Sequence, residues 1–158
     1  MDLYNNIINL PFDFKKLDYE RCPDPQFDIS KKTLLGEMYN DKLDNNKNDL
    51  SHLNVKKWKN FAWCFYKLNP GHWIPPHVDH FKHYSKFYKI KDKSKIVRTL
   101  IFLEDWAPGH VFCTENNLIL HWKANDGLTW KPTDIHWGGN FGNTERYTLQ
   151  LTGIPAEN

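Results

Sequence analysis

The C-terminal part of the chain alternates hydrophobic and polar residues with a period of two. Residues 146–152 read RYTLQLT, which places a hydrophobic set and a polar set on opposite faces of a strand. The hydrophobic set is Tyr147, Leu149 and Leu151, and the polar set is Arg146, Thr148 and Gln150. The pattern predicts a strand whose hydrophobic face joins the core. Its polar face either meets solvent, which is the commoner arrangement, or lines the mouth of a barrel.

Short runs that are typical of strands follow one another from residue 58, separated by Pro, Gly, Asn and Asp. The run VRTLIFL, residues 97–103, has the strongest β-propensity. The expected strands cover residues 61–66, 73–79, 96–103, 110–113, 118–122, 128–130, 134–137 and 146–152. Short strands with tight turns, and no helix between them, indicate a mainly β jelly roll or small barrel.

The N-terminal third has a different character. Residues 28–40, DISKKTLLGEMYN, predict a helix, because Asp28 or Ser30 can cap it and its hydrophobic residues share one face. We therefore expect a single domain over the whole chain. Residues 1–57 would form a supporting segment with its helix packed outside, and residues 58–153 would form the β core.

Composition narrows the class of protein. The chain has 158 residues, of which 40% are hydrophobic and 25% charged, with a formal net charge of +2. This is a globular composition that gives no strong case for nucleic acid or membrane as the main partner. The three cysteines are far apart and lack C-x-x-C spacing, which argues against a disulfide framework or a thiolate zinc site. There is no signal peptide and no long apolar run, so we expect a cytoplasmic location, or the host cytoplasm for a viral chain.

A candidate metal site begins in the stretch PGHWIPPHVDHF, residues 70–81. His77 and Asp79 are two residues apart, so on a strand they would share a face and reach one ion together. Such a pair is weak evidence alone, because it is also common among surface or packed histidines. His136, after a later strand, can supply the third ligand of a 2-His-1-carboxylate triad, an arrangement that suits Fe(II) and leaves positions open.

The polar face of the last strand then gains a function. Arg146 comes ten positions after His136, and Thr148 lies on the same face two residues further on. An arginine can hold a carboxylate bidentately, and a neighbouring hydroxyl can add a hydrogen bond. The alternative for Arg146 is a surface salt bridge.

The order H-x-D, a distant His, then Arg ten residues later resembles the 2-oxoglutarate/Fe(II)-dependent oxygenases, closest in motif to the prolyl 4-hydroxylase-like branch. The likeness covers roughly residues 60–153 and includes CFYKLNPGHWIPPHVDHF, RTLIFLEDW and WKANDGLTWKPTDIHWGGN. It implies a double-stranded β-helix, a jelly-roll or cupin-like fold. It also implies Fe(II) on His77, Asp79 and His136, and 2-oxoglutarate held by Arg146, Thr148 and Tyr66.

The resemblance implies a dioxygenase that uses O2 and 2-oxoglutarate to hydroxylate a peptidyl or amino-acid-like substrate, prolyl among the options, with release of succinate and CO2. Two positions depart from related branches. Phe102 stands where the prolyl hydroxylase branch often has a tyrosine, which puts a prolyl substrate in doubt. Thr152 stands where nucleic-acid-dealkylating relatives usually have a second arginine, which counts against a nucleic-acid substrate. Asp79 favours hydroxylation, because the halogenating relatives lack this carboxylate.

Further residues near the motif are candidates for substrate contact. Arg98 is expected on an inward face, and Trp73, Trp130 and Trp137 can form part of a substrate cage, although tryptophans in a small barrel more often belong to the core. The basic and aromatic segment 80–98 can be a lid for an acidic or peptide substrate, a nucleic-acid contact or a plain solvated loop. His80 follows Asp79 and faces away from it, so it is excluded from the site.

A non-catalytic explanation stays open. The same triad would also suit a cupin-like metal- or sugar-binding module, or a non-oxidative cupin isomerase. Neither of these needs Arg146 and Thr148 in register with His136. The composition leaves the oligomeric state open, with a monomer among the options.

Overall fold

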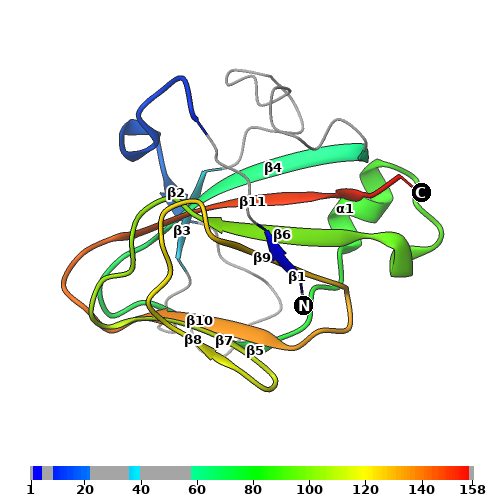
Figure 1. The fold of residues 1–158 in the computed structure, drawn as a ribbon. Helices are drawn as coiled ribbons and strands as arrows, with labels where there is room; N and C mark the ends of the chain where they lie inside the picture. The colour runs from blue at the N-terminus through cyan, green and yellow to red at the C-terminus, as the bar shows by residue number, and fades with distance from the viewer. Residues whose placement is uncertain (1, 5–8, 22–35, 40–57, 157–158) are drawn as a thin grey trace.

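The computed structural model describes residues 2–4, 9–21, 36–39 and 58–156. These residues form two antiparallel sheets that lie one above the other (Figure 1). The seven-stranded sheet has the order β1-β9-β6-β11-β4-β3-β2, and the four-stranded sheet has the order β5-β10-β7-β8. The strands are β1 (Asp2–Tyr4), β2 (Glu20–Arg21), β3 (Glu37–Tyr39), β4 (Lys59–Leu68), β5 (Trp73–His77), β6 (Val97–Phe102), β7 (His110–Thr114), β8 (Leu118–Ile119), β9 (Gly127–Trp130), β10 (His136–Asn140) and β11 (Arg146–Ile154).

Every strand predicted from residue 58 onwards is present, which confirms a mainly β jelly roll of the double-stranded β-helix type. The segment 80–98 differs from the prediction, since it contains a short helix, α1 (Lys82–Phe87), and a 3-10 turn (Lys93–Lys95). A second 3-10 turn, η1 (Phe14–Lys16), lies between β1 and β2 in the chain. No helix among the described residues is long and apolar enough to span a bilayer.

The predicted helix over residues 28–40 falls mostly outside the described residues, and its described end is a strand instead. Residues Glu37–Tyr39 form β3, which pairs with residues 65–67 of β4. Hydrogen bonds to neighbouring strands outweigh local helical periodicity here, because pairing within the sheet satisfies the backbone groups that a helix would otherwise satisfy internally. Within the described part of residues 1–57, the supporting segment therefore extends the sheet.

The long strand β11 occupies the centre of the larger sheet, between β4 and β6. Its hydrophobic set faces outward from the cavity between the sheets. Leu149 and Leu151 are fully buried with Trp63, Phe65 and Ile101, and side chains of the N-terminal segment cover this cluster. The polar set faces the space between the sheets, where Arg146 and Gln150 line a cavity. The strand thus has two buried faces, one packed and one lining the site.

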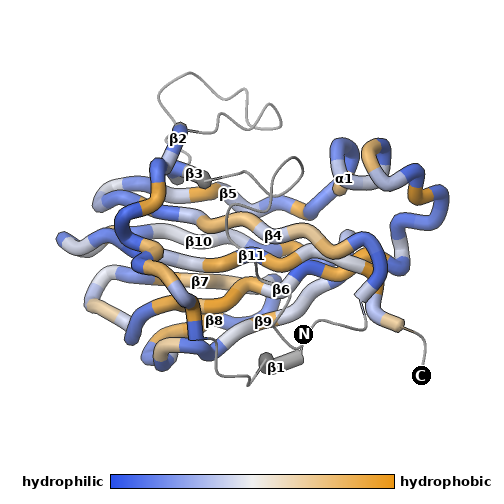
Figure 2. The backbone as a smooth tube through the Cα atoms, turned by 90° about the horizontal axis from the view of Figure 1, so that it is seen from above, coloured by the Kyte–Doolittle hydropathy of each residue, from blue (hydrophilic) through white to orange (hydrophobic). Residues whose placement is uncertain are grey.

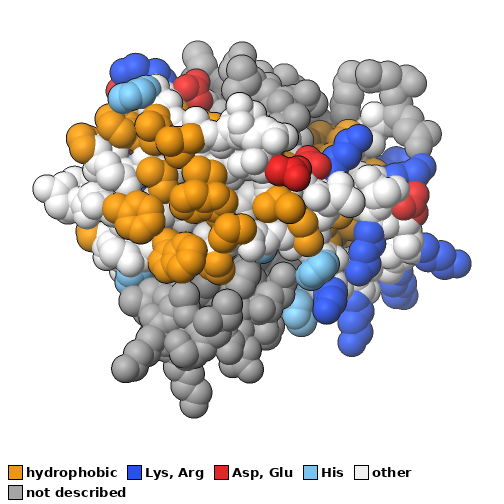
Figure 3. All heavy atoms as spheres, turned by 90° about the horizontal axis from the view of Figure 1, so that it is seen from below, with side chains coloured by type: hydrophobic (Ala, Val, Ile, Leu, Met, Phe, Trp, Pro, Cys, Tyr) orange, Lys and Arg blue, Asp and Glu red, His pale blue; other side chains and the backbone are white. Residues whose placement is uncertain are grey.

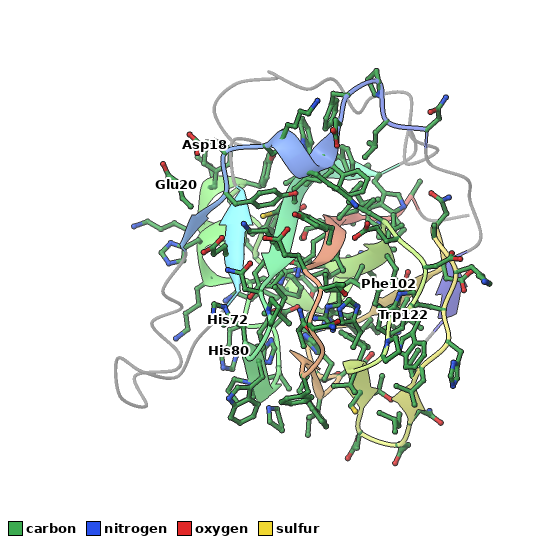
Figure 4. All side chains as sticks on the ribbon, turned by 90° about the vertical axis from the view of Figure 1, so that its left-hand side faces the viewer. Asp18, Glu20, His72, His80, Phe102 and Trp122 are labelled. Carbon is green, nitrogen blue, oxygen red and sulfur yellow. The ribbon has the colours of Figure 1, made fainter. Side chains whose placement is uncertain are left out.

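Part of the core consists of packed aromatic rings. Phe102 and Trp122 stack with ring centroids 3.8 Å apart, and Figure 4 shows the two side chains close together. Phe112 and Trp130 belong to the same buried cluster. Phe102 is therefore a core residue, which explains why an apolar ring stands at this position.

Hydrophobic and charged side chains occupy different parts of the structure. Figure 2 shows hydrophobic stretches along the strands and hydrophilic residues in the connecting turns. Seen from below, hydrophobic side chains gather over the four-stranded sheet and lysines gather at the end where α1 lies (Figure 3). The exposed large hydrophobic residues include Trp73, Leu118, Ile135 and Phe141.

Candidate metal site and its cavity

The triad predicted from the sequence is assembled in space. One ligand atom from each of His77, Asp79 and His136 lies within 4.8 Å of the others. The register of the smaller sheet brings the histidines together, because His77 at the end of β5 is the Cα partner of His136 at the start of β10. Asp79 differs slightly from the expectation of two ligands on one strand, since β5 ends at His77 and Asp79 lies in the turn that follows. The side chains still converge.

Both histidines present the same ring nitrogen to Asp79. His77 Nδ1 lies 2.8 Å from the Pro75 carbonyl oxygen, and His136 Nδ1 lies 3.0 Å from that of Asp134. A carbonyl accepts a hydrogen bond and fixes the proton on Nδ1, so Nε2 of each ring keeps its lone pair for a metal. The Nε2 atoms lie 4.0 Å and 3.7 Å from the Asp79 carboxylate oxygens.

Burial keeps His136 neutral. It lowers the pKa of this histidine to about 4, although the Asp79 carboxylate opposes the effect. A neutral imidazole is the form that binds a metal ion, so His136 is ready for ligation at neutral pH without first losing a proton.

Asp79 is held by two donors that come from distant strands. Arg98 Nη1 donates to one carboxylate oxygen at 2.9 Å, and Trp130 Nε1 donates to the other at 2.8 Å. Burial raises the pKa of Asp79, but Arg98, His136 and Trp130 together outweigh it, and the pKa lies below its ordinary value. The carboxylate is therefore charged, oriented and available as a ligand.

The role of Trp130 was not predicted from the sequence, which assigns this residue to the core or to a substrate cage. Trp130 is 2% exposed and does belong to the core, yet its indole N–H is used to orient Asp79. No sequence signal marks this contact, because the two residues are 51 positions apart. A buried indole N–H usually has an acceptor, and that tendency is the only available hint.

A cavity between the sheets connects the triad to Arg146. Twelve residues line it: Tyr66, Ile74, His77, Arg98, Leu100, Phe112, Trp130, His136, Trp137, Gly138, Arg146 and Gln150. Tyr66, Arg98 and Trp137 were predicted near the site and do line the cavity. Trp73 was predicted there too but is 36% exposed and does not line it. His80 is exposed, as predicted from its position after Asp79.

Arg146 is buried without an acidic partner among the described residues. Its Nη1 donates to the carbonyl oxygens of Val111 and Gly139 at 2.6 Å and 3.2 Å, whereas its Nε has no partner there. Burial lowers the pKa of Arg146 to about 10, which still leaves it charged at neutral pH. The Thr148 hydroxyl, on the same face of β11, is 1% exposed and equally without a partner in the described chain. The two groups lie on one face of β11 and could together hold an anion.

Two glycines give these side chains their space. A Cβ on Gly138 would lie 3.1 Å from Arg146 Nη2 and 3.3 Å from Phe112, so a larger residue would crowd the guanidinium. A Cβ on Gly36 would clash at 2.3 Å with the Tyr66 ring, and the Gly36 amide donates to the Tyr66 hydroxyl at 2.6 Å.

The fold and the site define a double-stranded β-helix protein with a His-Asp-His cluster that could hold a metal ion. No family model matches the chain, and a search of curated proteins also finds no match. Solved structures do match. The cupin domain of Schizosaccharomyces pombe Cnp3 is similar with a TM-score of 0.52 and 6% identity, over 90% of this chain and 68% of that one.

Two bacterial proteins show lower similarity scores. A Klebsiella pneumoniae protein with a double-stranded β-helix domain has a TM-score of 0.47 and 14% identity, over 93% of this chain and 96% of that one. A predicted oxalate decarboxylase from Thermotoga maritima has a TM-score of 0.46 and 17% identity, over 75% and 80% of the two chains. Identities this low concern the fold alone, so the chemistry has to be argued from the site.

Proposed function

We propose that this chain is an Fe(II)- and 2-oxoglutarate-dependent dioxygenase that hydroxylates a peptidyl or amino-acid-like substrate, with release of succinate and CO2. One observation carries the proposal: the buried Arg146 has no acidic partner among the described residues and its Nε has no hydrogen-bond partner there, and it lines the same cavity as the metal-ligand candidates His77 and His136. A site that needs both a metal and an anion fits a metal-chelating dicarboxylate.

The residues fit both groups. His77, Asp79 and His136 would hold the iron, two through Nε2 and one through a carboxylate oxygen, and this donor set suits Fe(II). When bound, iron and 2-oxoglutarate supply the activation of O2 and the oxidation of a C–H bond. Arg98 and Trp130 keep the Asp79 carboxylate in place before a metal arrives, which limits the reorganisation that binding would require.

The other end of the cavity would hold the far carboxylate of 2-oxoglutarate. Arg146 has Nε free to donate, and Thr148 can add a hydroxyl hydrogen bond from the same strand face. Tyr66 lines the same cavity, where the resemblance to the oxygenases gives it a part in holding 2-oxoglutarate. Leu100 and Phe112 are almost fully buried on the cavity wall and limit the entry of water, which strengthens these charge-assisted hydrogen bonds.

The test is spectroscopic and does not need the substrate. Anaerobic addition of Fe(II) and 2-oxoglutarate to the protein should produce a weak visible charge-transfer band, and titration of the band gives the affinity. Arg146→Met should weaken 2-oxoglutarate binding roughly 10- to 100-fold, because a hydrogen bond to a charged group contributes about 1.5–3 kcal/mol. Arg146→Lys keeps the positive charge but loses the planar guanidinium, so its affinity for 2-oxoglutarate should lie between that of the wild-type protein and that of Arg146→Met.

A cupin-like binding module predicts a different result. It would bind Fe(II) or another divalent ion through the triad, give no band with 2-oxoglutarate and be indifferent to Arg146→Met. Metal binding without the band would overturn the oxygenase proposal in favour of that alternative.

A further inference from the structure

The segment of residues 80–95, which we call the basic segment, carries an unusual share of the charge. It has six lysines and one aspartate, a formal charge of +5, whereas the whole chain has +2, so the remaining residues carry −3. All six lysines are exposed: Lys82, Lys86, Lys89, Lys91, Lys93 and Lys95. Five of them, all but Lys95, form no ion pair with any residue that the structure describes.

The basic segment begins and ends next to residues of the site. Asp79 precedes it and Arg98 follows it closely, and these residues form the 2.9 Å ion pair inside the site, so both ends of the segment are anchored there. The guanidinium of Arg98 also lies 4.8 Å from the centre of the Phe81 ring, at the start of the segment. Figure 1 shows α1 at one end of the two sheets, and Figure 3 shows the lysines gathered at that end.

Packing holds the basic segment in place. Phe81 and Tyr84 are buried, with Ala62 and Ile96, in a small core of their own. The Tyr84 hydroxyl donates to the Asn60 carbonyl oxygen at 2.5 Å, and the Tyr88 hydroxyl donates to that of Phe61 at 3.2 Å. The apolar side of the segment is therefore used for packing, and the lysines are left on the outside as a fixed positive surface.

We infer that the basic segment is the docking surface for an acidic stretch of the peptide substrate, which it holds across the mouth of the cavity. The inference rests on the proposed function for the identity of the bound molecule as a substrate. Its physical basis is charge complementarity, since closely spaced lysines without acidic partners repel one another and an acidic chain would relieve that repulsion.

A peptide suits this surface better than a nucleic acid does. Surfaces that bind single strands combine positive charge with exposed aromatic faces on which bases stack. In the basic segment Phe81 and Tyr84 are buried and Tyr88 is half-buried with its hydroxyl bonded, which leaves only Phe87 exposed. The segment also contains no arginine, the residue whose planar fork favours phosphate.

The experiment measures binding directly, with the full chain and no added metal. Fluorescence anisotropy would follow a labelled ten-residue peptide of Asp and Glu with a central proline, at low ionic strength. Its controls are the matching Asn/Gln peptide and a ten-nucleotide single-stranded DNA. The double variant Lys86→Glu/Lys89→Glu should weaken binding of the acidic peptide about tenfold, since each exposed charge pair contributes a modest amount and reversal turns attraction into repulsion.

A matched variant separates local from global charge. Lys16→Glu/Lys123→Glu changes the net charge equally at exposed positions near Asp13 and Asp105, and it should leave peptide binding close to that of the wild-type protein. Equal weakening in both variants, absence of binding to the wild-type protein, or tighter binding of the DNA than of the peptide would each overturn the inference.

Failure of this inference is distinguishable from failure of the proposed function. The charge-transfer band with Fe(II) and 2-oxoglutarate should be the same in Lys86→Glu/Lys89→Glu as in the wild-type protein, because neither lysine lines the cavity. A band without peptide binding would refute the docking surface alone. Peptide binding without a band would refute the dioxygenase proposal, but it would still support the inference that the basic segment binds an acidic peptide.

Discussion

The buried neutral histidine of the triad makes the stability of the protein depend on pH. His136 is 4% exposed, and burial lowers its pKa from 6.5 to about 4. Between these two values the unfolded chain binds a proton at this residue that the folded protein does not bind. The free energy of unfolding therefore falls as the pH falls through this window, and the loss is complete below about pH 4.

The size of the effect follows from the two pKa values. Each unit of difference corresponds to about 1.4 kcal/mol, so the full loss is about 3 kcal/mol, and about 2 kcal/mol is lost between pH 7.5 and pH 5. Asp79 does not contribute in this range, because its pKa lies below its ordinary value of 3.8. His110 contributes with the same sign, since burial lowers its pKa as well.

Replacement of His136 isolates its contribution to the pH dependence of the unfolding free energy. In His136→Gln the difference in unfolding free energy between pH 7.5 and pH 5 should be about 2 kcal/mol smaller than in the wild-type protein. Urea unfolding with a chelator present, at both pH values, gives the measurement. His80→Gln, at an exposed position, is the control and should behave like the wild-type protein. An unchanged pH dependence in His136→Gln would show that His136 is not the buried neutral base described above.

Two other substitutions test the shape of the site. Gly138→Ala should raise the 2-oxoglutarate concentration needed for half-saturation several-fold and leave Fe(II) affinity unchanged, because the added Cβ would lie 3.1 Å from Arg146 Nη2. Parallel titrations with Fe(II) and with 2-oxoglutarate measure the two affinities. An equal loss of both affinities would contradict a local effect. Trp130→Phe removes the hydrogen-bond donor to Asp79 but keeps most of the aromatic ring. Fe(II) affinity should therefore fall roughly tenfold, as expected for the loss of a residue that orients a metal ligand. Isothermal titration with Fe(II) measures this change, and an affinity equal to that of the wild-type protein would refute the role of the indole N–H.

The fold was predictable from the sequence where local pattern and strand pairing agree. The alternation in RYTLQLT predicted the strand β11 and its two faces, and the runs after residue 58 predicted the other strands of that part of the chain, β4 to β10. The prediction failed at Glu37–Tyr39, where the residues form a strand between β4 and β2. Helical periodicity is a local property, whereas the partner that stabilises β3 lies almost thirty residues away in β4.

By itself the sequence determined which side chains can ligate a metal and which can bind an anion, because side-chain chemistry and the spacing of His77, Asp79, His136 and Arg146 are written in it. Only the tertiary structure decided how those groups are held. Trp130 and Arg98 reach Asp79 from other strands, and the burial that keeps His136 neutral comes from residues far away in the chain. The physical reason is that orientation and dielectric environment arise from contacts between strands, and no local pattern specifies them.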